Sequence, residues 1–375
     1  MRIGFDARLY AETGIGRYIR NLLEQFKKID SSNQYFIFLN STSYKNFSLP
    51  NSNWHKIKVD LKWHSLKEQF LMPKILIRYN LDLVHFPYFN IPLFYKGKYV
   101  ITVHDLIIDH FPTGRASTLP FLFYKIKWII YHLIMKKSLS RSSKIFAISQ
   151  TTKNEIISHY GVTPSKIFVT FDALDQNFVD IKKKYYPKKR YPFDYLLYVG
   201  NAYPHKNLEN LIKAFSDPEI NSRVKLVLAG DDWFFYPRLK NFVNDLNLIS
   251  SIIFFGKAND EDLIDLYSFS KGLIIPSFME GFGLPNLEAV FLDKLPIISD
   301  IQVFREIWGN DMEYFNPQDN QSIKKSINNL FSLNTDKYNK IIYKAKMRAK
   351  KFSWEKTAKE TLLQYKEIDD KINGH

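Results

Sequence analysis

The feature that most constrains the fold of this 375-residue chain is an alternation of short apolar runs with longer amphipathic segments. The short runs are rich in β-branched and aromatic residues, and the longer ones have helical spacing, which together predict parallel sheets of the α/β class. In the first half the predicted strands are residues 2–6, 35–40, 83–87, 99–105, 144–149 and 166–171. In the second half they are residues 195–200, 224–230, 251–256, 271–277 and 295–300.

Helical patterns fall between these runs, at residues 16–29, 149–161 and 207–216. Ser149 is placed to cap the second of these helices and Gly161 to end it. Two successive series of this kind predict two doubly wound domains that face one another across a cleft, with ligands bound outside the carboxyl ends of the strands.

The chain is too long for one compact core, so a domain boundary is expected. The basic, aromatic segment 181–194 is predicted to be a linker between a first domain, residues 1–180, and a second domain, residues 195–354.

Composition excludes several classes of protein. The chain has no cysteine, so disulfides, thiolate nucleophiles and cysteine-bound metals are impossible. Its start lacks the long apolar run of a signal peptide, and we therefore expect a cytoplasmic protein. The net charge of +15 is concentrated in residues 1–181, where 24 Lys and Arg stand against 13 Asp and Glu. Such a bias suits phosphates, nucleic acid or an anionic membrane, or serves solubility alone.

No segment has the roughly 18 uncharged apolar residues that a membrane span needs. The nearest is residues 119–137, which Lys125, Lys127 and His132 interrupt. Basic residues at its ends and several aromatics, Trp128 among them, suit a helix that lies in a membrane interface. A buried packing helix is an equally good interpretation.

The first glycine-rich candidate is Gly14-Ile15-Gly16, which lacks the third glycine and the tight strand-to-helix turn of a dinucleotide site. A glycine loop that opens a helix can still hold an anion, although it is often only a turn.

The second candidate follows the first strand of the second domain. Gly200 ends that strand, Lys206 lies in the next loop, and Asn207 is placed to cap the following helix. A lysine beside a helix start is a suitable counter-charge for a phosphate, although most such lysines are simply solvated.

The third candidate is the segment from Glu280 to Glu288, "EGFGLPNLE". Its glycine turn predicts successive backbone N–H groups at a helix start, with Pro285 at the first helical position. Glu288 is predicted in the first turn, where a carboxylate is favoured in any case. That explanation does not extend to Glu280.

His104 and Asp105 end an interior strand of the first domain at its carboxyl edge, where a histidine is a candidate for catalysis as well as for packing. The pair Asp231-Asp232 and the run from Asp260 to Asp262 suggest metal ligands at first sight. The run, however, begins a helix, where acidic residues belong.

Taken together, these segments resemble the family 4 glycosyltransferases of the GT-B fold, which is an α/β fold of two Rossmann-like domains. The resemblance covers nearly the whole chain. It includes "IGFDARLYAETGIGRYIRNLLEQF", "ITVHDLIIDHFP", "LYVGNAYPHKNLENLIKAF", "GLIIPSFMEGFGLPNLEAV" and "FSWEKTAKETLLQY". It implies that the final helix, residues 355–375, packs back on the first domain.

The resemblance also implies roles for individual residues. Glu288 would bind ribose hydroxyls, Glu280 the transferred sugar, and Lys206 the diphosphate. His104, Glu280 and Lys206 are the predicted catalytic residues. The predicted donor-binding residues are Gly16, Gly200, Asn201, Lys206, Lys257, Glu280, Gly281, Phe282, Gly283, Leu284 and Glu288.

One position departs from the pattern. Many members carry a phosphate-binding arginine where this chain has Asn201, and Arg17, His205 or Lys257 are candidates to compensate. We expect no metal and no cofactor, because a lysine and helix-start N–H groups can stabilise a departing diphosphate. The donor would be a GDP- or UDP-linked sugar.

The predicted function is retaining transfer of a hexose to a hydroxyl of a saccharide or lipid-linked acceptor in surface polysaccharide assembly, including lipopolysaccharide. A mannose-type donor is favoured, because the loops resemble the mannosyl and rhamnosyl transferases of O-antigen assembly. The protein would be cytoplasmic, with peripheral contact to the inner face of an anionic membrane. The alternatives are a GT-B sugar-nucleotide epimerase and a basic nucleic-acid-binding protein; no RNA-recognition signature supports the latter, and we expect no nucleic-acid partner.

Overall fold

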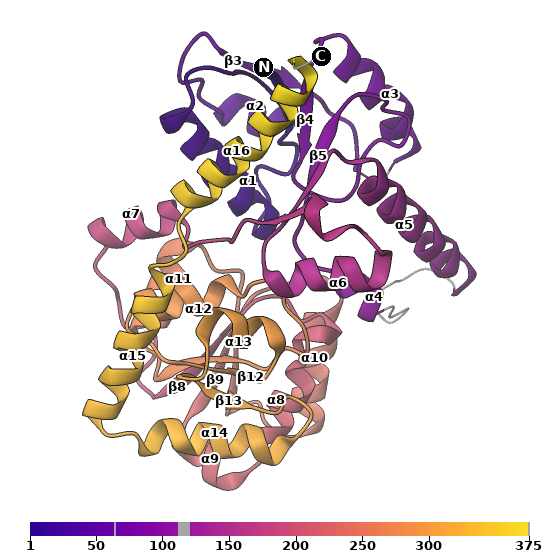
Figure 1. The fold of residues 1–375 in the computed structure, drawn as a ribbon. Coiled ribbons are helices and arrows are strands. Elements are labelled where there is room, and N and C mark those ends of the chain that lie inside the picture. Colours follow the sequence, from indigo (N-terminus) through magenta and orange to yellow (C-terminus); the bar gives the residue numbers. More distant parts are fainter. Residues whose placement is uncertain (64, 112–120, 374–375) are drawn as a thin grey trace. The chain divides into compact units, whose positions relative to one another are not determined.

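The computed structural model describes residues 1–63, 65–111 and 121–373 (Figure 1). The described residues form two compact units, each built on one parallel sheet. The first unit draws on Met1–Leu106, Ser117–Asp172 and Ser353–His375, and the second on Ile107–Ala116 and Ala173–Phe352. The chain therefore divides at Asp172, whereas residue 180 was the expected boundary.

The first sheet has seven parallel strands among the described residues, in the order β3-β2-β1-β4-β5-β6-β7. The order changes direction between β1 and β4, which is the point where doubly wound sheets bind ligands. The strands are β1 (Arg2–Asp6), β2 (Gln34–Leu39), β3 (Trp54–Lys58), β4 (Leu83–Phe86), β5 (Tyr99–Val103), β6 (Lys144–Ala147) and β7 (Ile167–Val169).

The helices of the first unit include α6, whose predicted ends are confirmed. The Ser149 hydroxyl accepts a hydrogen bond from the Thr152 N–H, and Gly161 ends the helix at φ 63°. The helices are α1 (Gly14–Ile29), α2 (Ser41–Asn46), α3 (Leu66–Ile77), α5 (Phe121–Arg141), α6 (Gln150–Tyr160), a 3-10 turn η2 (Pro164–Lys166) and α16 (Trp354–Asn373).

The second sheet has six parallel strands in the order β10-β9-β8-β11-β12-β13, again over the described part of the chain. Its switch point lies between β8 and β11, which pair at Leu196–Gly272 and Leu197–Leu273. The strands are β8 (Tyr195–Val199), β9 (Lys225–Ala229), β10 (Ile252–Gly256), β11 (Gly272–Ile275), β12 (Pro296–Ser299) and β13 (Glu313–Phe315).

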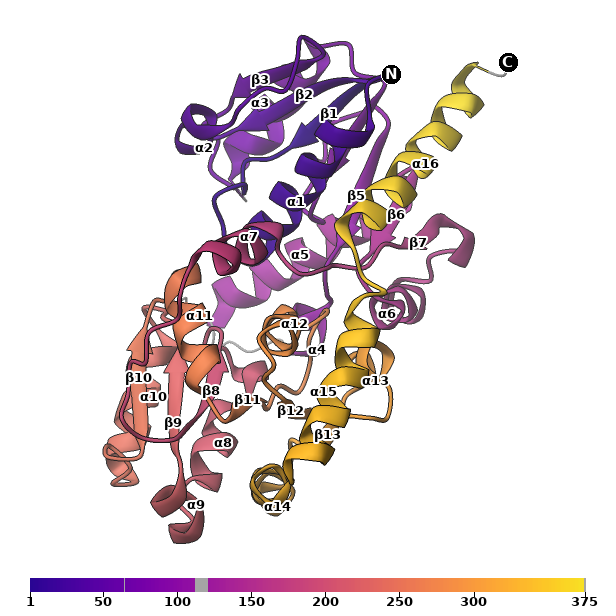
Figure 2. The same ribbon diagram turned by 90° about the vertical axis from the view of Figure 1, so that its left-hand side faces the viewer.

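The second unit also contains helices, several of which flank its sheet (Figure 2). They are α4 (Ile107–His110), α7 (Gln176–Lys184), η3 (Pro204–Lys206), α8 (Leu208–Ala214), α9 (Pro218–Arg223), α10 (Phe235–Asp245), α11 (Asp260–Phe269), α12 (Leu284–Phe291), α13 (Gln302–Trp308), α14 (Asn320–Ser332) and α15 (Thr335–Ala349). Since α7 extends to Lys184, the first residues of the predicted linker are helical.

The chain returns to the first unit through α16, which lies alongside α1 (Figure 1). One face of α16 is buried at the helical spacing of Trp354, Ala358, Thr361, Tyr365 and Ile368. The Tyr365 hydroxyl contacts Nδ1 of the buried His85 at 2.5 Å, and the Trp354 ring packs edge-on against Tyr18. This helix is therefore part of the core of the first unit.

Two strands escaped prediction from the sequence. β3 lies at the edge of its sheet, and of its five residues Trp54 alone is buried, so it lacks the continuous apolar run of an interior parallel strand. β13 has only three residues.

Candidate functional site

The candidate site of the second unit lies where β8 and β11 end side by side. Two loops leave this carboxyl edge, one after each strand, and they are joined by a hydrogen bond from the Phe278 N–H to the His205 carbonyl oxygen at 2.8 Å. The topology therefore brings Lys206, from the first loop, next to Glu280, from the second.

Lys206 and Glu280 form an ion pair, with 2.7 Å between Nζ and Oε1. The Ser277 hydroxyl donates to the same carboxylate oxygen at 2.6 Å. Burial alone would raise the pKa of Glu280, but the charge and hydrogen bond of Lys206 outweigh it, so the pKa lies below its ordinary value. The lysine side chain is 17% exposed and the glutamate 12%, so both can be reached by a ligand.

The loop after β8 has a backbone that few residues adopt. Gly200 has φ 150°, and its carbonyl oxygen accepts a hydrogen bond from the Tyr236 hydroxyl at 2.8 Å. Asn207 has φ 59°, and its side-chain amide donates to the carbonyls of Pro276 and Pro317. Asn207 occupies the N-cap position of α8, as predicted, but its side chain makes no capping hydrogen bond because that amide holds neighbouring loops together instead.

The loop after β11 ends at Gly283, which has φ 88° and stands directly before α12. A Cβ at Gly283 would lie 2.6 Å from the Phe304 ring, so both the backbone angle and the space require glycine. Leu284 is the first helical residue, and Pro285 is the second rather than the first. Pro285 has no N–H, and the Asn286 N–H donates to the Gly283 carbonyl oxygen at 3.0 Å. In this first turn the Leu284 N–H is therefore the donor best placed to meet an anion.

Glu288 does not lie in the first turn of α12, contrary to the prediction. Because the helix begins at Leu284, Glu288 is its fifth residue, and it is 1% exposed. Its Oε2 accepts a hydrogen bond from the Tyr267 hydroxyl at 2.9 Å. Helix-start capping therefore does not explain this carboxylate, which is held in place from α11.

Asn286 is a residue that the sequence reasoning missed. It lies in the first turn of α12, is fully buried, and neither polar atom of its side chain has a hydrogen-bond partner among the described residues. An unpaired buried amide costs about 1–3 kcal/mol and therefore calls for an explanation. The sequence signal that could have revealed it is a polar residue, Asn286, between Leu284 and Leu287 at a helix start.

The other predicted donor-binding residues of the second unit differ in exposure. Gly281 is buried, and the Phe282 ring packs edge-on against Phe352, so only the backbone of Phe282 is suited to contact a ligand. Lys257 is exposed and directly follows Gly256, the last residue of β10. Asn201 is partly buried, and its carbonyl oxygen accepts a hydrogen bond from the Tyr198 hydroxyl.

Among the residues considered as substitutes for an arginine at position 201, His205 supplies no charge near neutral pH. Burial, together with the charge of the neighbouring Lys206, lowers its pKa to about 4. Lys206 therefore stands as the one cation of this loop among the described residues from Gly200 to Asn207.

In the first unit, His104 directly follows β5. Its Nε2 lies 2.9 Å from the Pro87 carbonyl oxygen, and because a carbonyl only accepts, this nitrogen carries the proton. Burial lowers the pKa of His104 to about 4, so the ring is neutral and Nδ1 is a hydrogen-bond acceptor. Its ring also packs edge-on against Tyr18 at 5.0 Å.

Gly16 lies inside α1, which begins at Gly14. A Cβ at Gly16 would lie 2.9 Å from the carbonyl oxygens of Leu9 and Tyr10, so glycine is needed for the close approach of that loop. The expectation that this glycine opens the helix is wrong by two residues.

The acidic candidates have structural partners. Asp232 accepts hydrogen bonds from the backbone of α10 and from the Ala202 N–H. Asn259 and Asp262 form a capping box at the start of α11, as predicted for acids at a helix start. Among the described residues, no group of three or more His, Asp or Glu side chains is arranged to hold a metal ion.

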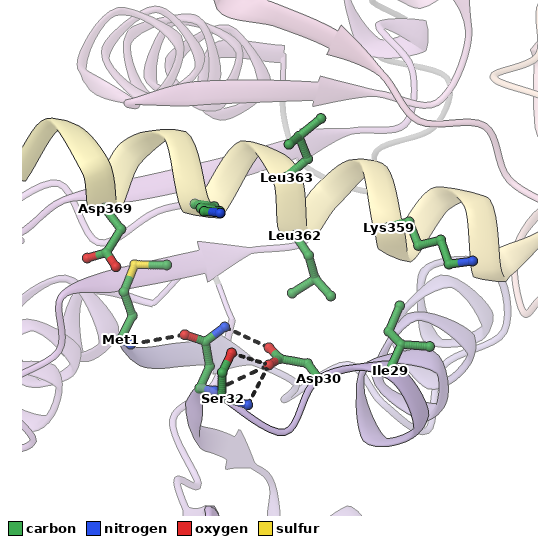
Figure 3. A pocket seen from close by; sticks show the side chains of 10 residues that line it. Met1, Ile29, Asp30, Ser32, Lys359, Leu362, Leu363 and Asp369 are labelled. Atoms are coloured by element: carbon green, nitrogen blue, oxygen red, sulfur yellow. Dashed lines mark hydrogen bonds between the residues drawn. The ribbon is translucent and has the colours of Figure 1, made fainter.

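Each unit also contains a cavity. One of about 590 Å³ is in the first unit, between α16 and the amino-terminal ends of the strands, and Met1, Asp30 and Leu362 line it (Figure 3). Ligands of doubly wound sheets bind at the opposite, carboxyl edge, so we do not regard this cavity as the site. Another, of about 360 Å³, lies in the second unit beside the loop that carries Lys206, and Tyr203 and Arg238 line it.

Comparisons with known proteins identify both parts of the chain. Residues 13–177 match the family described as Glycosyltransferase Family 4, and residues 181–348 match Glycosyl transferases group 1. The O-antigen chain mannosyltransferase RfbU of Salmonella typhimurium is 30% identical over 73% of this chain and 71% of its own length. The O-antigen chain mannosyltransferase B of Escherichia coli is 28% identical over 76% and 74%.

Solved structures share the fold at low identity. The sucrose-phosphate synthase of Thermosynechococcus elongatus has a TM-score of 0.74 and 17% identity, over 98% of this chain and 99% of its own. The Anabaena protein Alr3699/HepE, solved with UDP and glucose, has a TM-score of 0.72 and 15% identity, over 98% and 99%. The fold is GT-B, as expected, and the chain belongs to the family 4 glycosyltransferases.

Proposed function

We propose that this glycosyltransferase moves a hexose, of the mannose type, from a GDP- or UDP-linked donor to a hydroxyl of a saccharide or lipid-linked acceptor in O-antigen or lipopolysaccharide assembly. The observation that carries the proposal is the accessible Lys206–Glu280 pair beside the glycine start of α12. The mannose-type donor is supported by RfbU and mannosyltransferase B, both named as O-antigen chain mannosyltransferases.

The donor's diphosphate would accept a hydrogen bond from the Leu284 N–H at the start of α12, and it would approach Lys206. As Lys206 moves to the phosphate, Glu280 is left to accept hydrogen bonds from the hydroxyls of the transferred sugar. Glu288, already positioned by Tyr267, would accept from the ribose hydroxyls. Before the donor binds, the ammonium of Lys206 and the carboxylate of Glu280 would thus neutralise each other.

Departure of the diphosphate leaves positive charge on the sugar, and positioned electrostatics stabilise both fragments. We propose that the acceptor hydroxyl attacks from the face that the phosphate leaves, which retains the anomeric configuration, and that a phosphate oxygen takes the hydroxyl proton. The neutral His104, with Nδ1 as an acceptor, would receive a hydrogen bond from a sugar or acceptor hydroxyl. No metal ion takes part in this scheme.

The chain would work in the cytoplasm, in peripheral contact with the inner face of the membrane, where a lipid-linked acceptor is found. In the part of the chain that the structure describes, no helix is both long and apolar enough to cross a bilayer. The charge of residues 1–181 suits an anionic lipid surface, where each basic residue adds about 1 kcal/mol.

The test is a thermal-shift screen of GDP- and UDP-linked sugars, since a ligand at 100 times its Kd stabilises by about 2.7 kcal/mol. The stabilising donor is then incubated with lipid-linked acceptor in EDTA, and the product is examined by NMR. The proposal expects a retained α-linkage and release of nucleoside diphosphate. Conversion of the sugar nucleotide without acceptor would identify an epimerase instead, and full dependence on a divalent ion would overturn the metal-free scheme.

A further inference from the structure

We propose that the outward apolar faces of α3 and α5, together with Phe94, form the surface through which the first unit binds an anionic lipid bilayer. The proposal deepens the proposed function, because it names the surface that would bring the enzyme to a lipid-linked acceptor. The evidence for the surface itself does not depend on the sugar chemistry.

Helix α5 is apolar on both of its sides. Its inner side buries Ile134, Met135 and Leu139 in the core of the first unit. Its outer side exposes Ile126, Ile129, Ile130 and Leu133, which repeat at three- and four-residue intervals and therefore form one stripe. An ordinary surface helix is polar on its outer side, so within the described part of the chain this stripe lacks the apolar partner that its composition calls for.

Helix α3 repeats the pattern. Leu66, Phe70 and Ile77 lie on one side of the helix and are 80%, 56% and 62% exposed, and Leu71 flanks them. The Phe70 ring stacks on Phe94 at 4.9 Å, which extends the apolar area onto the loop after β4.

The same loop joins the two helices into one surface. The Leu93 N–H donates to Gln69 of α3 at 2.7 Å, and the Leu93 carbonyl accepts from Arg141 of α5. The Ser138 hydroxyl, also on α5, donates to the Phe89 carbonyl at 2.7 Å. Figure 1 shows both helices on the same side of the first sheet. By contrast, the exposed Trp233 and Ile249 of the second unit belong to different segments, as is normal for a protein surface.

The positive charge of these two helices indicates that the apolar surface binds an anionic lipid bilayer. The sequence of α5 contains no Asp or Glu and carries Lys125, Lys136, Lys137 and Arg141. The single acid of α3, Glu68, is fully buried and paired with Arg8. A second copy of the chain, docked on the same face, would set lysines against lysines, whereas an anionic bilayer offers both apolar and negative groups.

Trp128 lies where tryptophan residues of membrane-bound proteins usually lie, at the edge of the apolar surface. It is 37% exposed, and its ring packs against His132 at the border of the apolar stripe. Indole rings favour the headgroup level of a bilayer, between water and the acyl chains. Trp128 therefore supplies a spectroscopic probe of insertion.

The test measures co-sedimentation with vesicles of phosphatidylcholine alone and of phosphatidylcholine mixed with phosphatidylglycerol. The wild-type chain is expected to bind the mixed vesicles, less as salt rises. The double variant Ile129→Ser, Leu133→Ser leaves the charge unchanged. It is expected to bind the mixed vesicles at least roughly tenfold more weakly than the wild type does. The matched control, Trp233→Ser, Ile249→Ser in the second unit, should bind as the wild type does.

A second measurement uses lipids brominated along the acyl chains, which quench nearby tryptophan fluorescence. Quenching is expected for the wild type and should be lost in Trp128→Phe. Equal vesicle binding by the two double variants, or dimerisation of the wild type that only the α5 variant abolishes, overturns the proposal. Vesicle binding without any nucleotide-sugar binding would count against the proposed function and support the lipid surface. Nucleotide-sugar binding without vesicle binding would support the proposed function and overturn the lipid surface.

Discussion

Two ion-paired clusters lie at corresponding places in the two units, and they differ in burial. In the first unit Arg8, just after β1, pairs with Asp6 and with Glu68 of α3, each at 2.6 Å. All three side chains are at most 1% exposed. In the second unit Lys206, just after β8, pairs with Glu280 alone and remains partly exposed.

The clusters therefore serve different purposes. The Arg8 guanidinium meets two carboxylates and stacks on Trp63. Burial alone would lower the pKa of Arg8, but these carboxylates outweigh it and raise the pKa. This arrangement fixes a loop onto α3. The ammonium of Lys206 meets a single carboxylate, which under the proposed function it would exchange for a phosphate.

The largest expected effect is on stability, from Arg8→Met. Removal of this cation leaves two carboxylates buried without a counter-charge, which costs roughly 3–5 kcal/mol. Urea unfolding measures the loss. Lys206→Met should cost under about 1 kcal/mol, because its partner can reach water. Equal losses in the two variants would show that the clusters do not differ in the way proposed.

The next effect is on turnover. Lys206→Ala should lower kcat/KM about 10² to 10³-fold, because the departing diphosphate loses its charge partner. Initial rates with saturating acceptor measure it. Lys257→Ala is a matched change in an exposed lysine of the same unit. Its resemblance to a donor-binding position of family 4 glycosyltransferases predicts weaker donor binding with a smaller loss of turnover. A Lys206→Ala enzyme with normal turnover would remove this residue from the site.

His205 gives the second cluster a dependence on pH. Its pKa is about 4 in the folded chain and 6.5 ordinarily, so the unfolded chain takes up a proton first as pH falls. Stability should be greatest above pH 6.5 and decline toward pH 4, by up to roughly 3 kcal/mol from this residue. The unfolding free energy of His205→Gln, compared with the wild type between pH 7 and 4.5, isolates the contribution. Identical slopes would contradict it.

Nucleotide affinity should respond more moderately. Glu288→Gln removes a charged acceptor, so donor binding should weaken roughly tenfold to a hundredfold, corresponding to about 1.5–3 kcal/mol. Isothermal calorimetry measures the Kd. Tyr267→Phe, which removes one hydrogen bond to Glu288 but leaves the glutamate in place, should weaken binding less. A larger loss in the tyrosine variant would mean that Glu288 is a structural residue.

The smallest effect concerns Asn286. Replacement by leucine removes a buried unpaired amide, so stability should rise by about 1 kcal/mol. If the amide is kept for a ligand, donor affinity falls in the same variant. A stability gain without any change in affinity would show that Asn286 is only a tolerated defect.

The sequence sufficed for the interior strands, because a strand buried on both faces is a continuous apolar run that no exposed segment imitates. It failed for β3, where the edge-strand sequence "WHKIK" has three polar residues among its five and no continuous apolar run. The ends of α6 were predictable as well, since Ser149 and Gly161 act through local backbone chemistry.

The sequence could not show which of the predicted site residues lie side by side. Glu280 and Lys206 lie 74 positions apart, and only the pairing of β8 with β11 brings them together. Asn207 was misassigned because its partners, the carbonyls of Pro276 and Pro317, are distant in sequence. The missing partners of Asn286 are a property of its surroundings, which the residue type alone does not reveal.

The return of the chain through α16 has a consequence for synthesis on the ribosome. The first unit is built from residues near both ends, and Trp354 and Tyr365 fill its core. Domains usually fold in the order in which they emerge, amino-terminal first. Here residues 173–352 have all been synthesised before α16 emerges, so until then the first unit leaves exposed the apolar surface along α1 that α16 covers. The first unit to be translated is thus the last to finish folding, and it needs protection from aggregation in the meantime.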